Sequence, residues 1–268
     1  MNIITTIIKF FINCFSSIIK KNKGALKYLF MVSLKDEIVL FYENEYLTNY
    51  AHIDKAISLA KQYIKKGFLI IDVGGADGVT PRIFSKSFPD KKILIFEPIK
   101  ENYTKIKSLI TTFPNFILVS KAAGNFIGKT NINIANRITS SSIFNLKNDN
   151  KSDIFSNILE KQRNEEIEVT TLDSEVPLEY EIGILKIDVQ GYELEVLKGS
   201  INTLPRTSII VLELNNHNGY ENSPKYFELD HFLRNENFTL YDIFPSTKDK
   251  GRLKEWDSIY INNRILCE

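Results

Sequence analysis

Short apolar runs alternate with segments of helical periodicity along most of this chain, and this alternation constrains the fold more than any other feature. The apolar runs cover residues 68–73, 93–96, 116–119, 182–188 and 208–214. The helical segments cover residues 81–88, 100–112, 193–204 and 226–235. Apolar runs of this length are typical of strands that are buried on both faces. Their alternation with helices predicts an α/β fold with a doubly wound, mostly parallel sheet, which residues 238–244 and 258–261 close with an antiparallel edge.

Two segments depart from this alternation. Residues 1–66 form a predicted N-terminal helical extension, in which apolar residues recur at steps of three and four, first within residues 4–19 and again within residues 53–64. Residues 126–175 alternate polar and apolar side chains and contain a serine-rich turn. We interpret residues 126–175 as an inserted hairpin with loops that is suited to act as a lid. The remaining domain extends over residues 67–268.

The amphipathic stretch at residues 1–23 has three interpretations. It is a helix that packs on its own domain or on a partner subunit, a helix that lies on a membrane surface, or a membrane span. Lys9 and Asn13 interrupt the apolar run, which weakens the third interpretation, because a span needs roughly 20 apolar residues. No basic segment precedes the run, which disfavours a signal peptide. Peripheral membrane contact and self-association through residues 1–23 are therefore both retained.

Composition excludes several classes of protein. The 34 Lys and Arg residues balance 33 Asp and Glu residues, and a net charge of +1 provides no strong basic field for nucleic acid. The cysteines, Cys14 and Cys267, lie near opposite ends of the chain, so no disulfide framework is indicated. The histidines, His52, His217 and His231, are too scattered to predict a metal site. A reduced, cytoplasmic setting is the expectation, with peripheral contact at the inner membrane face as an extension of it.

The strongest local motif is the segment at residues 71–78, Ile-Asp-Val-Gly-Gly-Ala-Asp-Gly, between the first strand and the first helix. Glycine lets the backbone approach a ligand closely, and a helix start offers free N–H groups. The glycines, Gly74, Gly75 and Gly78, do not match the Gly-x-Gly-x-x-Gly spacing of a dinucleotide site. The alternative is a glycine-rich turn without a ligand.

Charged residues accompany the ends of the predicted strands. Glu97 ends the second strand, where a carboxylate can accept hydrogen bonds from the hydroxyls of a ribose, unless it is simply exposed to water. Lys186 and Asp188 alternate with apolar residues on a strand that is expected to be central. Charges this deep are paired or used in function. A structural pair of Lys186 with Asp188 or with Glu213 is the alternative to a catalytic Asp188.

Several of these segments together resemble the FkbM family of S-adenosylmethionine-dependent methyltransferases. They are residues 71–78, 96–98, 171–173, 185–199 and 212–214, and the resemblance extends over about residues 68–215. The most family-specific part is Lys-Ile-Asp-Val-Gln-Gly followed by Glu-Leu-Glu-Val-Leu-Lys-Gly. The family usually has Asn in place of Ala76 and often Glu in place of Gln190, which argues against a catalytic role for position 190. The resemblance implies a Rossmann-like methyltransferase sheet with S-adenosylmethionine as cofactor.

The same resemblance implies the cofactor site. Asp72, Gly74 and Gly78 are expected under the methionine part and Glu97 at the ribose. The full set of implied cofactor-binding residues is Asp72, Gly74, Gly75, Gly78, Glu97, Pro98, Lys121, Ala122, Ser141, Ser142 and Asp188. Lys121 and Ala122 are expected on the adenine side through their backbone, and the two serines are expected to approach from the lid.

The resemblance also points to an oxygen acceptor, a hydroxyl on a sugar, a glycan or another small molecule. Asp188 is the first candidate for the base that accepts the hydroxyl proton, and His217 is the second unless it is a solvated loop histidine. Asp188 and Glu213 are too few carboxylates to predict a metal. Two alternative functions remain: a nicotinamide-dependent oxidoreductase on a similar sheet, and a non-catalytic protein that acts through its N-terminal helix as a membrane or assembly module.

Overall fold

The computed structural model describes residues 50–64, 67–145, 161–216, 220–249 and 251–266. Within the chain, His52–Glu268 forms one compact unit. The described strands of its main sheet are β1 (Leu69–Val73), β2 (Ile93–Phe96), β3 (Phe116–Val119), β7 (Ile182–Ile187), β8 (Thr207–Asn215), β9 (Phe238–Asp249) and β10 (Arg252–Asn262). The described helices are α4 (Ala51–Tyr63), α5 (Val79–Ser87), α6 (Lys100–Leu109), α8 (Leu172–Glu175), α9 (Glu193–Lys198), α10 (Tyr226–Asn235) and α11 (Asn263–Leu266), with 3-10 turns η1 (Ile138–Ser140) and η3 (Leu204–Arg206).

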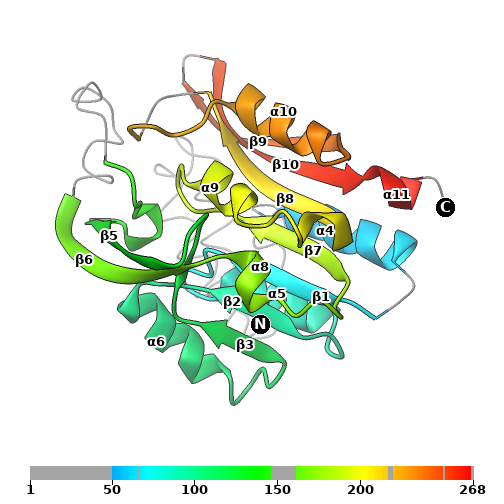
Figure 1. The fold of residues 1–268 in the computed structure, drawn as a ribbon, viewed down its shortest axis with the longest axis horizontal. Coiled ribbons are helices and arrows are strands. Elements are labelled where there is room, and N and C mark those ends of the chain that lie inside the picture. Colours follow the sequence, from blue (N-terminus) through cyan, green and yellow to red (C-terminus); the bar gives the residue numbers. More distant parts are fainter. Residues whose placement is uncertain (1–49, 65–66, 146–160, 217–219, 250, 267–268) are drawn as a thin grey trace, which may run out of the picture. The chain divides into compact units, whose positions relative to one another are not determined.

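The main sheet has the order β3-β2-β1-β7-β8-β10-β9 in the described part of the chain. Strands β3, β2, β1, β7 and β8 are parallel, and β10 is antiparallel to both β8 and β9. Helices lie on both sides of this sheet (Figure 1). The predicted α/β, doubly wound sheet with an antiparallel edge is therefore confirmed.

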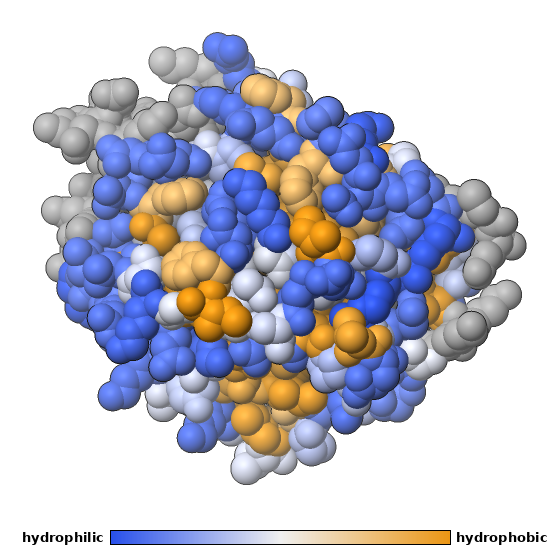
Figure 2. Space-filling model, in the orientation of Figure 1, coloured by the Kyte–Doolittle hydropathy of each residue, from blue (hydrophilic) through white to orange (hydrophobic). Residues whose placement is uncertain are grey.

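The central strands are buried because both of their faces carry apolar side chains. Every residue of β1 and of β7 is buried. Leu69, Ile71 and Val73 of β1 belong to one core cluster with apolar side chains of α8, α9 and α10. Polar side chains cover much of the face drawn in Figure 2, with hydrophobic groups between them. No helix in the described part of the chain has the length and apolar character that a membrane crossing requires.

Strand order places a switch point between β1 and β7. From β1 the chain builds outward through β2 and β3, and it then returns to add β7 and β8 on the other side of β1. Ligands of open α/β sheets bind outside the carboxyl ends of the strands at such a point. The residues that follow β1, β2 and β7 are therefore the candidates for a ligand site.

The compact unit begins at His52, and the predicted division of the chain at residue 67 stays a prediction. Helix α4 follows the predicted periodicity within residues 53–64, and its Ile53, Ala56 and Ala60 are fully buried. A contact between His52 and Asp257 of β10 joins α4 to the antiparallel part of the sheet. Residues 1–49, with the amphipathic stretch at residues 1–23, lie outside the described residues.

The predicted insertion at residues 126–175 contains a hairpin. Strands β5 (Gly128–Ala135) and β6 (Lys161–Thr170) pair antiparallel, and the short β4 (Ala122–Ala123) pairs parallel with β6. These strands form a separate sheet of order β4-β6-β5 among the described residues. The role of this segment as a lid stays a prediction.

Two helices are shorter than the sequence analysis expected. The predicted helix over residues 100–112 ends at Leu109. The predicted helix over residues 193–204 ends at Lys198, and Leu204–Arg206 forms a separate 3-10 turn. Gly199 follows α9, and glycine is a poor helix former. By contrast, the predicted helix at residues 226–235 has the observed bounds of α10.

Candidate active site

The register of the central strands brings three of the predicted site residues to one edge of the sheet. Val73 of β1 is the register partner of Phe96 in β2 and of Ile187 in β7. The next residues along these strands are Gly74, Glu97 and Asp188. The backbone N–H of Gly74 donates to the carbonyl of Phe96 (3.0 Å), and that of Asp188 donates to the carbonyl of Val73 (3.1 Å). The turn, the buried acid and the aspartate are therefore neighbours.

Packing within the protein requires glycine at two positions of the turn after β1, Gly74 and Gly75. Gly74 has a φ of +86°, and a Cβ on it would lie 2.0 Å from the backbone oxygen of Asp188. A Cβ on Gly75 would lie 2.4 Å from the side chain of Ile95. Gly78 also has a positive φ, of +79°, at the start of α5. The expectation that these glycines admit a ligand stays a prediction, because the structure already explains Gly74 and Gly75 by the elements packed against them.

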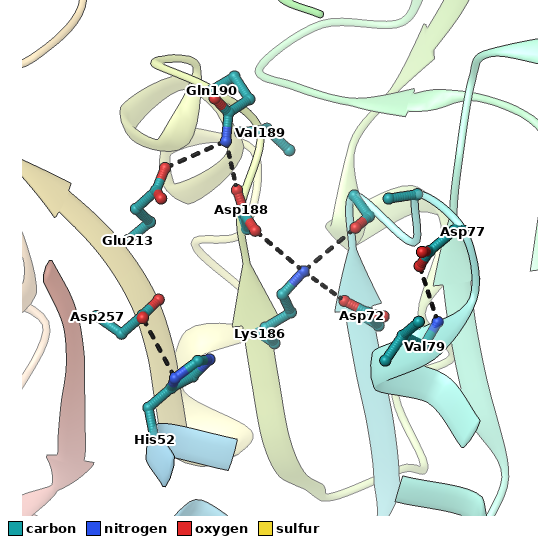
Figure 3. Close-up of polar contacts among 12 residues, drawn as sticks. His52, Asp72, Asp77, Val79, Lys186, Asp188, Val189, Gln190, Glu213 and Asp257 are labelled. Carbon is teal, nitrogen blue, oxygen red and sulfur yellow. Dashed lines mark hydrogen bonds and ion pairs between the residues drawn. The ribbon is translucent and has the colours of Figure 1, made fainter. Parts of the chain in front are cut away.

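Lys186 is the centre of a buried charge network (Figure 3). Its Nζ lies 3.1 Å from Oδ1 of Asp72 and 3.6 Å from Oδ2 of Asp188, and it donates to the carbonyl of Gly74 (3.2 Å). Burial alone would lower the pKa of Lys186, but the carboxylates of Asp72 and Asp188 outweigh burial and raise it. Lys186 therefore stays protonated, and its partners are Asp72 and Asp188 rather than Glu213.

Asp72 lies beneath this network, with no exposed surface. Burial raises the pKa of Asp72 to about 6, although Lys186 acts in the opposite direction. Oδ1 of Asp72 forms an ion pair with Lys186, and a role of Asp72 toward a cofactor stays a prediction.

Glu97 is a buried carboxylate whose oxygens face backbone donors. The N–H of Ala76 donates to Oε2 (2.8 Å) and that of Ile99 donates to Oε1 (2.9 Å). Ala76 donates from a left-handed conformation, with a φ of +47°. Burial raises the pKa of Glu97 to about 7, against the backbone donors and the side chain of Asn102, which lower it. Glu97 is 3% exposed and has no ion pair with another described residue.

Asp188 is held between two donors on opposite sides of its carboxylate (Figure 3). Lys186 faces Oδ2, and the amide Nε2 of Gln190 donates to Oδ1 (2.9 Å). The same Nε2 donates to Oε2 of Glu213 on β8 (3.2 Å). The Asp188 side chain is 38% exposed, so it is the accessible acid of the network. Burial, followed by the charge of Asp188, raises the pKa of Glu213 well above its usual value.

The predicted serines lie next to this network, and their hydroxyls contact protein groups. The hydroxyl of Ser142 donates to the backbone oxygen of Gln190 (2.7 Å) and accepts from the N–H of Phe144 (3.1 Å). The hydroxyl of Ser141 accepts from the N–H of Ala135 (3.1 Å). Ser142 thus joins the serine-rich segment to the loop after β7, and an approach of the serines to the cofactor stays a prediction.

The remaining predicted cofactor residues lie on neighbouring segments. Pro98 is half-buried immediately after Glu97. Lys121 directs its Nζ to Oε1 of Glu175 (2.9 Å), and Ala122 is buried in β4. The side chain of Lys121 is therefore paired with a protein group, and a backbone contact of this segment with the cofactor stays a prediction. His217, the second candidate base, lies outside the described residues.

Sequence reasoning missed a histidine and an acid near the network. Nδ1 of His52 on α4 lies 3.2 Å from Oδ2 of Asp257 on β10, beside Lys186 (Figure 3). Burial lowers the pKa of His52 to about 4 and raises that of Asp257 to about 7. The residues are 205 positions apart, and no motif links them, so only the fold could reveal the contact.

Glu193 and Gln190 were also missed as parts of the site. Oε1 of Glu193 accepts from the N–H groups of Gly191 (2.9 Å) and Val189 (3.3 Å), which shapes the loop after β7. Burial raises the pKa of Glu193 to about 7. Both residues lie in the segment at residues 185–199 that resembles the family, so their position in the sequence could have indicated a role in the site. The resemblance had argued only against a catalytic Gln190. No cluster of three or more metal-ligating side chains occurs among the described residues.

The parallel sheet, its switch point and the acids at its carboxyl edge define an α/β enzyme of the doubly wound class. The model of the methyltransferase FkbM domain matches residues 72–240, which is more than half of the chain. The chain belongs to the FkbM methyltransferase family, and its cofactor is S-adenosylmethionine. No curated protein matched the sequence.

Solved structures with similar folds include other methyltransferases. Magnesium protoporphyrin IX methyltransferase from Synechocystis PCC 6803, with bound SAM, is 8% identical, with a TM-score of 0.45 over 79% of this chain and 78% of that chain. The 1,6-didemethyltoxoflavin-N1-methyltransferase of Burkholderia thailandensis, with S-adenosylhomocysteine, is 10% identical, with a TM-score of 0.42 over 90% of this chain and 88% of that chain.

The residues at the sheet edge fit this cofactor. A carboxylate can accept about four hydrogen bonds, and protein groups do not use the full capacity of Glu97. Glu97 therefore has acceptor capacity for a ribose hydroxyl. Asp188 presents a partly exposed negative group at the same edge, which suits a positively charged sulfur.

Proposed function

We propose that this S-adenosylmethionine-dependent methyltransferase methylates a hydroxyl group of a sugar, a glycan or another small molecule. The observation that carries the proposal is the position of Asp188, a partly exposed carboxylate at the carboxyl end of β7, between Lys186 and Gln190. A protonated hydroxyl is a poor nucleophile, so its methylation benefits from a carboxylate that can accept its proton.

In the proposed mechanism, residues at the carboxyl ends of the parallel strands have different roles. Glu97 would hold the ribose, and Asp188 would lie where the cofactor meets the acceptor. When bound, S-adenosylmethionine supplies a methyl group whose bond to the positively charged sulfur breaks with its electron pair left on sulfur. Asp188 orients the acceptor hydroxyl and takes its proton. A fixed orientation of this kind contributes up to roughly 7–11 kcal/mol to lowering a barrier.

Lys186 has a separate role in this proposal. It neutralises the fully buried Asp72 and donates toward one oxygen of Asp188, which keeps the carboxylate of Asp188 in place. A nearby cation also weakens a carboxylate as a base. We therefore assign Asp188 chiefly to orienting the hydroxyl, with proton transfer as the methyl group moves. His217 remains the second candidate base.

Transfer of a labelled methyl group to candidate acceptors tests this function. Purified full-length chain is incubated with S-adenosylmethionine labelled in its methyl group and with sugars, nucleotide sugars and glycan fragments, and the products are treated with alkali. A methyl ether survives alkali and a methyl ester does not, so alkali-stable label that is bound to oxygen supports O-methylation of a hydroxyl. Label found only on nitrogen or as ester would contradict the proposed acceptor.

The Asp188→Asn variant tests the assigned residue. We expect it to bind S-adenosylhomocysteine with an affinity close to that of the unmodified chain and to lose about 10²–10⁴-fold in turnover. Unchanged turnover would remove Asp188 from the reaction. Membership of the FkbM family leaves the oxidoreductase alternative without support. Binding of S-adenosylhomocysteine without binding of NAD in a thermal-shift comparison would agree with that.

We also propose a cytoplasmic location, with residues 1–23 in contact with a membrane surface or with a second copy of the chain. The support is the amphipathic pattern of the sequence. Nucleic acid is not a proposed partner, because the chain is nearly neutral. Co-sedimentation with anionic vesicles, and sedimentation velocity without them, with and without residues 1–23, would separate the two contacts.

A further inference from the structure

Gln190 occupies a strained and central position in the loop after β7. Its φ of +55° is left-handed, a conformation that residues other than glycine and asparagine adopt at a cost. Glu193, Ser142 and Tyr220 each contact this loop or its glutamine. A conformation of this kind persists only where its surroundings determine it, and it is concentrated at functional positions.

The side-chain amide of Gln190 links two acids from neighbouring parallel strands. Nε2 lies 2.9 Å from Oδ1 of Asp188 and 3.2 Å from Oε2 of Glu213. An amide nitrogen has two protons, so both are used. The contact with Asp188 decides the orientation of the amide, because the oxygens of the Asp188 carboxylate accept hydrogen bonds and would repel the amide oxygen.

The rest of Gln190 is held by the segments around it. The hydroxyl of Ser142 donates to its backbone oxygen (2.7 Å). The hydroxyl of Tyr220 lies 3.4 Å from its Oε1 and 2.9 Å from the backbone oxygen of Ser140. Gln190 thus connects the predicted lid segment, Tyr220 and strand β8 to Asp188.

We propose that Gln190 is a positioning residue for methyl transfer, whose amide fixes the orientation of the Asp188 carboxylate and separates it from Glu213. This inference rests on the proposed function, in which Asp188 faces the reacting groups. Two donors then hold Asp188, Lys186 at Oδ2 and Gln190 at Oδ1. A carboxylate with two fixed donors cannot rotate toward Glu213, and its negative charge stays in one place.

The charge on the cofactor offers a readout that needs no acceptor. S-adenosylmethionine has a positive sulfur, and S-adenosylhomocysteine does not, while the two share their other groups. A correctly oriented Asp188 favours the first ligand over the second, because opposite charges attract at short range. Loss of the orientation should therefore reduce the affinity for S-adenosylmethionine more than the affinity for S-adenosylhomocysteine.

The experiment measures the dissociation constants of both ligands by calorimetry for full-length variants. Gln190→Met keeps most of the side-chain volume and removes the amide. We expect the preference for S-adenosylmethionine over S-adenosylhomocysteine to fall about fivefold, which corresponds to one ordinary hydrogen bond. Gln62→Met, at an exposed position of α4, is the matched control and should leave both constants unchanged. If Gln190→Met does not fold, Gln190→Asn replaces it, because Asn tolerates a positive φ and its shorter amide cannot reach both acids.

A double-mutant cycle tests whether the effect passes through Asp188. Asp188→Asn alone should remove the preference, and the addition of Gln190→Met should then change it by less than twofold. An equal loss of affinity for both ligands, or no loss, would overturn the inference without contradicting the proposed function. If the unmodified chain bound neither ligand, the proposed function itself would fail, and the inference with it.

Discussion

Asp72 and Lys186 are register partners on adjacent parallel strands, and the Nζ of Lys186 lies 3.1 Å from Oδ1 of Asp72 in the interior of the protein. Asp72 has no exposed surface and the side chain of Lys186 is 8% exposed. The same ammonium group reaches Asp188 at the edge where β7 ends. A pair that holds two central strands together is thus also the support of the candidate catalytic acid.

Removal of one member of this pair should be costly. The Lys186→Met variant leaves the buried Asp72 carboxylate without its cation, and we expect the free energy of unfolding to fall by about 3–5 kcal/mol. Urea unfolding followed by circular dichroism measures this. Lys198→Met, which removes an exposed ion pair with Glu195, should change the free energy by less than about 1 kcal/mol. A loss below about 1 kcal/mol in Lys186→Met would show that Asp72 does not depend on Lys186.

Substitution of Gly74 should disturb the fold because β7 lies against it. A Cβ at Gly74 would lie 2.0 Å from the backbone oxygen of Asp188, and the positive φ adds strain. We expect Gly74→Ala to lower the free energy of unfolding by about 3 kcal/mol or more. Gly67→Ala is the control, since no atom lies within 4 Å of the Cβ position there. Equal midpoints of thermal unfolding for the two variants would refute the packing argument.

Glu97 should make cofactor binding depend on pH. Burial raises its pKa to about 7, and a ribose hydroxyl donates more strongly to the ionised carboxylate. Affinity for S-adenosylhomocysteine should therefore increase as pH rises from about 6 to 8, with release of a proton on binding. Glu97→Gln should weaken binding about tenfold at pH 8 and flatten the pH profile. Calorimetry in buffers of different ionisation enthalpy detects the proton, with exposed Glu101→Gln as the control. If Glu97→Gln left the pH dependence of S-adenosylhomocysteine affinity unchanged, Glu97 would not be its cause.

Glu97 should also make the free energy of unfolding depend on pH, and this dependence should have the opposite sign to that of cofactor affinity. The pKa of Glu97 is higher in the folded chain than its ordinary value of 4.5. Its contribution to stability is therefore present below about pH 4.5 and is lost as pH rises to about 7. Other buried carboxyl groups with raised pKa values lose stability over the same range. Unfolding of the ligand-free chain should therefore show a smaller loss of stability in Glu97→Gln than in the unmodified protein. If the contribution of Glu97 to stability increased with pH instead, burial would not be the main influence on the pKa of Glu97.

His52 and Asp257 should shift acid stability in opposite directions. The pKa of His52 is lowered from 6.5 to about 4, so its contribution is lost as pH falls through that window, by about 2 kcal/mol at pH 5. The pKa of Asp257 is raised to about 7, so its contribution is lost as pH rises from 3.8 toward 7.

Urea unfolding at pH 7.5 and pH 5 tests this pair. Relative to the unmodified chain, we expect His52→Gln to gain stability on going to pH 5 and Asp257→Asn to lose it. The exposed His231→Gln variant should follow the unmodified chain. Shifts of the same sign in both variants would contradict the assignment of a neutral His52 beside a protonated Asp257.

The sequence by itself determined the order and class of the elements. Hydrophobic periodicity is a local property, and it located β1, β2, β3, β7 and β8, together with the ends of α10. It also placed Glu97 and Asp188 at one edge of the sheet, because parallel strands end at the same side. The motif around Asp188 was sufficient to indicate the family that the domain match shows.

Only the tertiary structure decided which charged groups became partners. Lys186 faces Asp72 because their strands are adjacent and in register. Local spacing had offered Asp188 or Glu213, and of these two described residues only Asp188 pairs with Lys186. The Gln190 amide reaches Glu213 because β8 lies beside β7, and His52 reaches Asp257 across 205 residues. Such contacts depend on strand order, on register and on the reach of a side chain, and no short stretch of sequence contains that information.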